Sequence, residues 1–542
     1  MKRITPKTNV IQASIAVLLF LEFAGSLFAL GTIGVPAQDG SAAQSAIVTF
    51  VSNHEQERAV QALVKSVREL SGAYRASKIF VLTTDEKELG CAALKQDGIE
   101  VLSLQMEREF MDYPLALKAF AAAQVEKKVK DSIDTLIWLD PGVIVLNSLA
   151  ALDLGEDFDA AVRPVTLANT IAIAPQTAAN DYWEPIYRET GLDFKSLPSF
   201  ETIVDPIPIQ PYFNCEVFSF KPRLGIAAEW ARLLTRFLKD EEYQKNACTS
   251  FLRKLFLHQA VLSAVIVSKA KPDRIKALPL ASGYPFGQHE RLAAAKKTAS
   301  LNDLSLAIFD NAWDRTPSWM EKVAIKEPLK GWLFDTYLEY LKLNDSLYKI
   351  EGSCNSYLVT TKDGSVLIDP AGAAAAPQFF RKVLADHPLK AILLTHAHQD
   401  HSDDIEKWKT DRDIPVIAQR KYREYFQYQT EFAEFFARRN AIWSGKPLAA
   451  PPPVADDSRG APTVFFADAY DFACGGLHFK MIHTPGETPD HTTIWIPELS
   501  AVFVGDNYYE YFINNSTFRG TMIRPVRGYI HALDTALTFT PE

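Results

Sequence analysis

The sequence predicts an α/β protein with two folded domains, and three observations predict this class. The chain has 542 residues, of which 47% are hydrophobic, so it can build more than one core. Its first half alternates short apolar runs with amphipathic runs of helical length. Its second half contains a series of short strands that leads into a histidine-rich loop. We expect a leader at residues 1–37, a first domain at residues 38–335 and a second domain at residues 336–542.

The overall charge and the cysteines limit the partners. The formal net charge is −9 and the isoelectric point is near 5.8, so the chain has no general affinity for nucleic acid or for anionic membranes. An anionic substrate must therefore be held by local charges. The five cysteines are an odd number without a C-x-x-C pair, which leaves open one or two disulfide bridges or buried free thiols. The oligomeric state stays open.

The first residues have the pattern of an export signal. Lys2, Arg3 and Lys7 precede a mostly apolar segment at residues 10–35, and small residues follow at Val35-Pro36-Ala37. We expect a periplasmic or secreted protein. An uncleaved membrane anchor is the alternative, because the apolar length approaches the ~20 residues that span a bilayer. No later segment predicts a membrane helix.

The first domain begins with alternating strands and helices. We predict strands at residues 46–51, 78–82, 100–104 and 135–139, and helices at residues 55–70 and 114–125. Such alternation predicts a mainly parallel sheet covered by helices, with ligands at the carboxyl ends of the strands. Residues 280–332, rich in glycine, proline, lysine and aspartate, predict the tail of this domain and a linker.

The segment at residues 136–140, which ends in Asp140, resembles glycosyltransferases of the nucleotide-sugar (type A) fold. Residues 143–146, 211–217 and 258–262 resemble later segments of the same family. Those enzymes hold a divalent ion with an Asp-x-Asp pair, whereas this chain has Asp140-Pro141-Gly142 and lacks the second carboxylate. An active transferase, a binding-only domain and a purely structural Asp140 all remain open.

The second domain contains a metal-binding pattern. We predict strands at residues 346–350, 356–360, 365–368 and 391–394, and a helix at residues 377–386. Side chains alternate along an extended segment, so His396 and His398 point the same way and can bind one ion. Asp400 and His401 face the other side, where they can hold a second ion.

The second domain resembles the metallo-β-lactamase fold, in which two sheets are sandwiched between helices. The resemblance rests on these strands, on Asp369 at the end of a strand and on the H-x-H-x-D-H loop. The resemblance covers residues 347–542. Most members of this superfamily have histidine as the third ligand of the first ion, where this chain has Glu487. The alkylsulfatase branch has glutamate there and a second acid nineteen positions later, which is Asp506 here. The resemblance implies that Asp506 bridges two zinc ions.

The same branch carries an Asn-x-x-x-x-Arg-Gly segment whose Asn and Arg hold the sulfate. Asn514 and Arg519 match it, and Arg524 is a second candidate or a surface ion pair. His483 and His491 are expected to be structural, because Glu487 takes the ligand place.

The resemblance also implies a last histidine after the helix at residues 526–539, and the chain stops before it. His531 is a poor substitute. We expect either a sequence that is truncated at its C-terminus or a weakly held second ion.

An aromatic-rich helical insertion at residues 420–443 predicts a hydrophobic binding wall over the metal ions or the buried face of a packing helix. Together these features predict a zinc-dependent hydrolase of a small anionic ester, an alkyl sulfate first of all, with Asp400, Asn514 and Arg519 as catalytic residues. A lactonase, thioesterase or phosphodiesterase is the alternative within the fold. The alternatives outside this fold are a glycosyltransferase or sugar-binding protein and an inactive fragment.

Overall fold

The computed structural model describes residues 44–84, 91, 94–95, 98–169, 171–175, 177–309, 322–352, 354–370, 380–409, 413–444, 461–509 and 522–540. The chain divides into two compact units that meet in sequence at Thr336 and Tyr337. The predicted leader lies outside the described residues, so export stays a prediction. Within the described ranges, we find no helix with the length and apolar character that crossing a bilayer requires.

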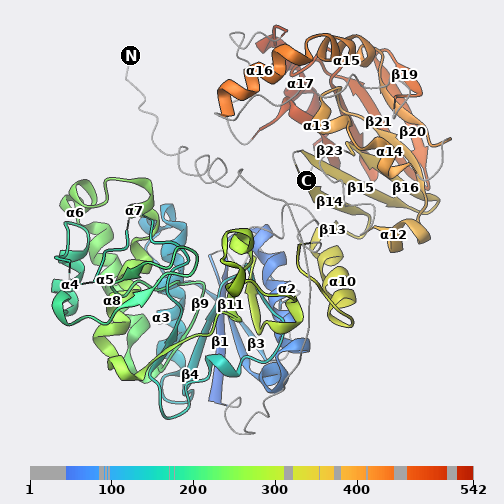
Figure 1. Cartoon of the computed structure of the whole chain (residues 1–542). Helices are drawn as coiled ribbons and strands as arrows, with labels where there is room; N and C mark the ends of the chain where they lie inside the picture. Colours follow the sequence, from blue (N-terminus) through green and yellow to red (C-terminus); the bar gives the residue numbers. More distant parts are fainter. Residues whose placement is uncertain are drawn as a thin grey trace. The chain divides into compact units, whose positions relative to one another are not determined.

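The first unit is built on a seven-stranded sheet with the order β10-β6-β9-β4-β1-β2-β3 (Figure 1). The strands are β1 (Ser45–Val51), β2 (Lys78–Thr83), β3 (Ile99–Ser103), β4 (Thr135–Leu139), β6 (Ala160–Val162), β9 (Val217–Phe220) and β10 (Ile275–Ala277). The first four are parallel to one another, and β9 runs antiparallel between β4 and β6. This arrangement confirms the mainly parallel sheet that the alternating pattern predicts.

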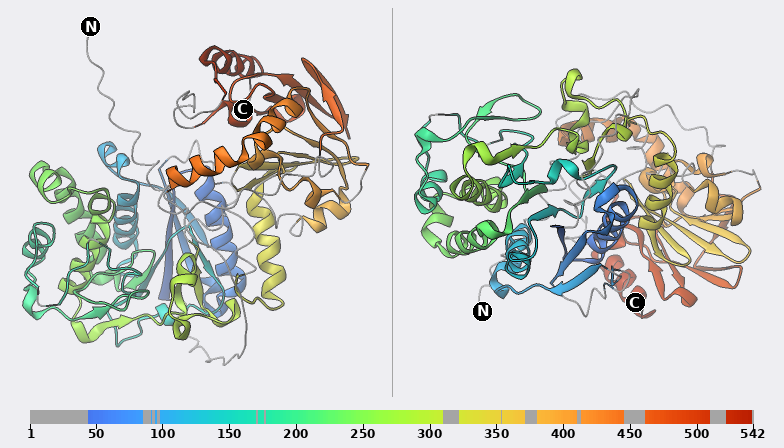
Figure 2. Two further views of the ribbon diagram at one scale, coloured as in Figure 1. Left: turned by 45° about the horizontal axis from the view of Figure 1, so that its top comes forward. Right: turned by 90° about the horizontal axis from the view of Figure 1, so that it is seen from below.

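Helices cover both faces of this sheet, because successive residues of a strand point to opposite sides. Ile47 and Val51 of β1 pack with α2 (His54–Leu70) in one core. Val48 and Phe50 pack in a second core, on the other face, with α3 (Leu117–Val129), α5 (Ile226–Lys239) and α8 (Leu257–Lys269). Figure 2 shows both layers in two further views.

Smaller elements complete the first unit. They include a three-stranded sheet of β11 (Ser282–Pro285), β12 (Leu306–Ile308) and β5 (Val143–Val145). The described part of the predicted tail and linker thus pairs with β5. The remaining elements are α4 (Trp183–Thr190), α6 (Glu241–Asn246), α7 (Phe251–Leu255), β7 (Phe200–Glu201) and β8 (Pro208–Ile209), and α10 (Leu329–Leu341) runs across the division between the units.

The second unit contains two sheets. The first has the order β13 (Lys342–Asn344), β14 (Leu347–Glu351), β15 (Asn355–Thr361), β16 (Gly364–Ile368), β17 (Leu389–Leu393), β18 (Val416–Gln419) and β19 (Val464–Phe466). It is antiparallel up to β16 and parallel from β16 onward. The second sheet is antiparallel and contains β20 (Ala469–Cys474), β21 (Leu477–His483), β22 (Thr492–Ile496) and β23 (Ala501–Phe503).

The core of this unit lies between the two sheets, where Val366 and Leu393 of the first sheet meet Met481 and Ile494 of the second. Helices lie outside. On the first sheet these are α12 (Arg381–Asp386), which packs against β16, and the short α13 (Gln399–Ser402) and α14 (Ile405–Trp408). On the second sheet, α17 (Val526–Leu537) is followed by Phe539, which stacks on Trp495 with ring centroids 5.4 Å apart.

This layering confirms the predicted sandwich of two sheets between helices. The five cysteines are all described and all free, which decides between the two predicted alternatives in favour of free thiols.

Candidate metal centre

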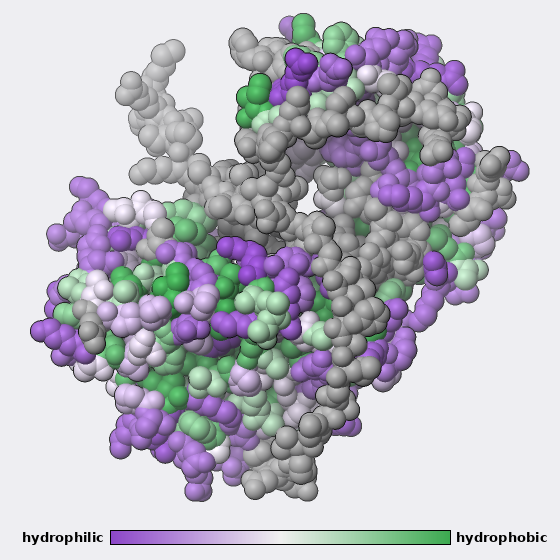
Figure 3. All heavy atoms as spheres, in the orientation of Figure 1, coloured by the Kyte–Doolittle hydropathy of each residue, from purple (hydrophilic) through white to green (hydrophobic). Residues whose placement is uncertain are grey.

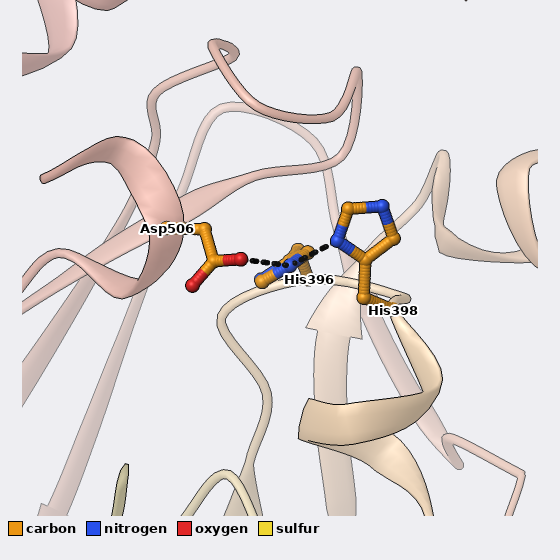
Figure 4. A group of neighbouring side chains, drawn as sticks. All are labelled: His396, His398 and Asp506. Carbon is orange, nitrogen blue, oxygen red and sulfur yellow. Dashed lines mark hydrogen bonds and ion pairs between the residues drawn. The ribbon is translucent and has the colours of Figure 1, made fainter. Parts of the chain in front are cut away.

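The loop after β17 and the end of β23 place three potential metal ligands together. His396 and His398 come from the loop, and Asp506 follows β23 in the second sheet. One ligand atom from each of these residues lies within 4.8 Å of the other two. Figure 4 shows His396 between the other two side chains. The closure of the two sheets therefore joins segments more than a hundred residues apart into one site.

The carboxylate of Asp506 lies between two imidazoles. Its Oδ2 atom is 3.9 Å from His396 Nε2, and its Oδ1 atom is 3.1 Å from His401 Nε2. The rings of His396 and His401 are close, with centroids 4.2 Å apart. Each oxygen of this acid therefore faces a different histidine.

Asp369, at the end of β16, sets the orientation of these rings. Its Oδ1 atom accepts from the Thr395 N–H at 2.8 Å, and its Oδ2 atom accepts from the Thr395 hydroxyl at 2.6 Å. The same Oδ2 accepts from His401 Nδ1 at 2.9 Å. Asp369 adopts the left-handed conformation with φ 51°, which aspartate tolerates better than most residues.

These hydrogen bonds determine which nitrogen of each ring is available. The Thr395 hydroxyl gives its only proton to Asp369, so it accepts from His396 Nδ1 at 3.0 Å. Nε2 of His396 is then the nitrogen that carries the lone pair. His401 likewise donates from Nδ1, which turns its Nε2 toward Asp506. Holding a ligand histidine through its second nitrogen is typical of metal sites.

His398 is the next potential ligand, and both of its ring nitrogens have a neighbour. His398 Nδ1 lies 2.8 Å from His396 Nε2, while His398 Nε2 lies 3.2 Å from the hydroxyl of Tyr425. Burial lowers the pKa of His398 to about 3 and the pKa of His396 well below its usual value. Both imidazoles are therefore neutral near pH 7, which is the form that binds a metal ion.

The donors fit a metal ion. His401 is buried, and its Nε2 faces Asp506 Oδ1 at 3.1 Å, so two potential ligand atoms lie next to each other. Burial would lower the pKa of His401, but Asp369 and Asp506 raise it well above its usual value, so the pair favours a positive charge there. Imidazole and carboxylate ligands suit both zinc and iron. His396, His398, His401 and Asp506 are the residues that would hold the metal.

The other predicted site residues have different places. Asp400 lies in α13 with an exposed side chain, within electrostatic reach of His401 and Asp506. Glu487 is not among the three converging residues. Its carboxylate forms an ion pair with Arg524 and accepts from the hydroxyl of Tyr529. Asn514 and Arg519 lie outside the described residues.

The two histidines that we expected to be structural have structural contacts. His483 Nε2 donates to the carbonyl of Pro489 at 2.8 Å. His491 is fully buried, accepts from the Asn507 amide at 3.0 Å and stacks on His396 with centroids 4.9 Å apart. Next to it, Gly505 has φ 48°, and a Cβ atom there would lie 2.8 Å from both His491 Nε2 and Thr395 Oγ1.

Sequence reasoning missed the groups that support the site. The sequence marks Asp369 only as a strand end and Tyr425 only as one ring of the aromatic insertion, and it does not mark Thr395 or Asn507 as supporting groups. An Asp-Pro pair directly after a buried strand is a signal for the first of these. The thiol of Cys354 also interacts with His401, and burial raises the pKa of that thiol. No pattern in the sequence marks Cys354 as a neighbour of His401.

An aromatic series leads away from His398. It runs along α15 (Tyr422–Glu431) and α16 (Ala433–Ser444) and contains Tyr425, Tyr428, Phe432, Phe435 and Phe436. The ring of Tyr425 lies 5.6 Å from that of His398, and each later step between neighbouring rings is 5.2–5.7 Å. Phe432 and Phe435 are 48% and 43% exposed, so the series reaches the surface. Figure 3 shows hydrophobic residues among the mostly hydrophilic surface of this unit.

A second polar cluster lies in the first unit, at the end of β4. The carboxylate of Asp140 forms an ion pair with Lys118, which is only 4% exposed, and accepts from Trp138 Nε1 at 2.6 Å. Cys215 Sγ lies 3.0 Å from His258 Nε2, but burial raises the pKa of this thiol to about 12. The pair is therefore not an activated nucleophile, and Asp140 already has a cation beside it.

Comparisons with known proteins agree with this division. Residues 350–532 match the metallo-beta-lactamase superfamily, and residues 47–270 match the Rhodobacterales glycosyltransferase domain. A linear primary-alkylsulfatase from Pseudomonas sp. is 24% identical over 210 residues, 34% of this chain and 39% of the relative. A hydroxyacylglutathione hydrolase from Bdellovibrio bacteriovorus is 26% identical over 155 residues, 28% of this chain and 48% of the relative. The chain thus spans less than half the length of these two relatives.

Among solved structures, the inverting sec-alkylsulfatase Pisa1 from Pseudomonas sp. is similar with a TM-score of 0.32 and 19% identity, over 39% of this chain and 38% of that protein. The family matches confirm the metallo-β-lactamase resemblance of the second unit and the glycosyltransferase resemblance of the first, whereas the type A fold of the first unit stays a prediction.

The network around Asp369 generates a test of the site. We expect Asp369→Asn to lower zinc affinity about 10- to 100-fold, because an amide cannot accept from Thr395 and His401 together. The measurement is zinc retention against a competing chelator. Asp345→Asn is the control, since that side chain is fully exposed and forms an ion pair with Lys342. Equal retention in both variants would contradict the positioning role of Asp369.

Proposed function

Because residues 350–532 belong to the metallo-beta-lactamase superfamily, we propose that this unit is a metal-dependent hydrolase of anionic esters, with alkyl sulfates as its substrate class. The observation that carries the proposal is the convergence of His396, His398 and Asp506 on one point, with His401 on the far side of the Asp506 carboxylate. Such donors hold one or two metal ions, which when bound lower the pKa of a water molecule and polarise the ester.

The residues of the chain would act around that centre. His396 and His398 supply neutral nitrogens, His401 faces Asp506 through Nε2, and Asp506 reaches both sides of the site. Asp400, which is exposed and within electrostatic reach of His401 and Asp506, is proposed to assist the activated water. Asn514 and Arg519 are proposed to hold the sulfate, on the sequence pattern alone. The Zn²⁺ identity and a second, bridged ion belong to the proposal as well.

Two observations favour an alkyl sulfate within this fold. The aromatic series begins at a ligand histidine and ends at the surface, so it offers an apolar path for an aliphatic chain. The second is that an alkylsulfatase is among the relatives. A hydrolase of another ester, such as a lactonase, thioesterase or phosphodiesterase, is the second candidate, because a hydroxyacylglutathione hydrolase is also among them.

The first unit offers a function of another class. Its match to a glycosyltransferase domain favours a sugar-binding or transferase role. The ion pair of Lys118 with Asp140 argues against a divalent ion at that carboxylate, because the ammonium already offsets its charge. We therefore propose that any sugar ligand binds there without metal.

Hydrolysis by the zinc-loaded full-length chain tests the main proposal. We expect hydrolysis of alkyl sulfates that is lost after treatment with a chelator and regained with zinc, while matched lactones and thioesters react at least tenfold more slowly. Protein that binds no transition metal, or that prefers the lactone or thioester, would contradict the assignment.

The role of the aromatic series is tested with substrate length. We expect Phe436→Ala to raise KM for a twelve-carbon sulfate about tenfold, because about 1.5–3 kcal/mol of apolar contact is lost, and to change KM for a short-chain sulfate little. Ile442→Ala is the control, since Ile442 lies on the same helix, is 80% exposed and is not in the series. An equal change for both chain lengths would argue for a packing role.

Calorimetric titration of nucleotide sugars, with and without manganese, tests the first unit. We expect manganese to leave the affinity unchanged, because Lys118 neutralises Asp140. Manganese-dependent binding that disappears in Asp140→Asn would contradict this expectation.

A further inference from the structure

We propose that Tyr425 is a positioning residue for His398, and that its hydroxyl remains the partner of this imidazole when the proton of the ring changes place on metal binding. Tyr425 would act within the proposed metal-dependent function of the second unit, on which this inference rests. The aromatic insertion would then have a second role besides its apolar path, because the same tyrosine begins the aromatic series.

Four hydrogen bonds in series join Tyr425 to Asp369. They run from the Tyr425 hydroxyl to His398 Nε2 at 3.2 Å, from His398 Nδ1 to His396 Nε2 at 2.8 Å, from His396 Nδ1 to Thr395 Oγ1 at 3.0 Å, and from the Thr395 hydroxyl to Asp369 Oδ2 at 2.6 Å. Asp369 is 3% exposed and Tyr425 is 4% exposed, so both ends of the series are buried. A polar atom that lost its partner there would therefore be costly.

The carboxylate at one end determines the direction of the whole series. An ionised carboxylate can only accept, so the Thr395 hydroxyl donates to Asp369 and its oxygen accepts from His396 Nδ1. His396 Nε2 then has the lone pair, and His398 Nδ1 donates to it. A neutral imidazole carries one proton, so His398 Nε2 accepts from the hydroxyl of Tyr425. In this structure the proton of His398 is therefore on Nδ1.

Binding of a metal ion by both histidines requires the opposite arrangement at His398. His396 and His398 belong to the converging group, and their facing nitrogens are Nε2 and Nδ1. A ligand nitrogen must offer its lone pair, so the proton of His398 must then be on Nε2. The ring keeps one proton in both states, because it loses a proton at Nδ1 and gains one at Nε2. A phenolic hydroxyl both donates and accepts, so Tyr425 can be the partner of Nε2 in either state.

Two further contacts hold α15, and with it Tyr425, against the ligand loop. Gln419, the last residue of β18, accepts from the Lys421 N–H at 2.6 Å, so the helix starts at the end of the strand that pairs with β17. One turn after Tyr425, Gln429 donates to the carbonyl of Ala397 at 2.6 Å, between the two histidines of the loop. Residues four apart share one face of a helix. The face of α15 that carries Tyr425 therefore lies on the ligand loop.

The experiment compares Tyr425→Phe with Tyr428→Phe in the full chain. The first substitution removes one oxygen and keeps the ring. The control removes the same oxygen three residues later on α15, where the ring of Tyr428 lies 5.7 Å from that of Tyr425. Zinc affinity is measured by competition with a chelator. The proton of His398 is located by nitrogen NMR of the unsubstituted chain labelled in its histidine rings, with and without zinc, and His398→Gln assigns the signal.

We expect Tyr425→Phe to bind zinc about tenfold more weakly than Tyr428→Phe. The hydrogen bond that a metal-bound imidazole donates is charge-assisted, so its loss costs more than the loss of the neutral bond in the zinc-free chain. In the unsubstituted chain, the proton of His398 should be on Nδ1 without zinc and on Nε2 with zinc. KM for a twelve-carbon sulfate should be the same in both variants, because each retains its ring.

Equal zinc affinity in the two variants would overturn the inference. So would a His398 proton that is already on Nε2 without zinc or that stays on Nδ1 with zinc. A tenfold higher KM in Tyr425→Phe with unchanged zinc affinity would show that the hydroxyl contacts the substrate and would also overturn it. The zinc and NMR measurements require no hydrolysis, so a zinc-binding chain that hydrolyses no ester would overturn the proposed function alone. An unsubstituted chain that binds no zinc would overturn both.

Discussion

The candidate metal centre depends on one buried carboxylate. Asp369 accepts hydrogen bonds from Thr395 and from His401, and through Thr395 it determines which nitrogen His396 presents. Without this acceptor, the Thr395 hydroxyl could donate to His396, and the nitrogen facing Asp506 would carry a proton. The geometry of four potential ligands thus depends on Asp369, which lies at the end of β16 and has a left-handed backbone conformation.

A buried acid at the end of a strand has different neighbours in the two units. In the first unit Asp140 contacts the ammonium of Lys118, so the charge at that sheet end is already balanced. In the second unit Asp506 faces imidazoles whose nitrogens are neutral or hold a positive charge only through neighbouring acids. In the first unit the charge of the acid is already neutralised, whereas the site in the second unit can accept a cation. This difference in charge, more than the fold, makes the second unit the candidate for metal-dependent catalysis.

Much of the architecture could be predicted from local patterns. The parallel strands around β1 and the position of β4 follow from apolar periodicity, whereas the sandwich of the second unit was predicted from the resemblance to the metallo-β-lactamase fold. Within the centre, His396, His398 and His401 could be chosen from one dense motif and Asp506 from its spacing to Glu487, and the structure brings these four together. Their role as ligands, like those of Asn514 and Arg519, stays a prediction. The partner of Glu487 could not be foreseen, because an acid that follows a glycine gives no sign of what lies opposite.

The sequence by itself determined the class of the two domains and the density of ligands in one loop, because strand periodicity and metal chemistry are local properties. Only the tertiary structure decided which atoms meet. Asp506 follows β23 of the second sheet, whereas His396 and His401 follow β17 of the first, and their contacts exist because the two sheets close around a shared core. Closure of the core places side chains by packing, and packing depends on all the residues of both sheets at once.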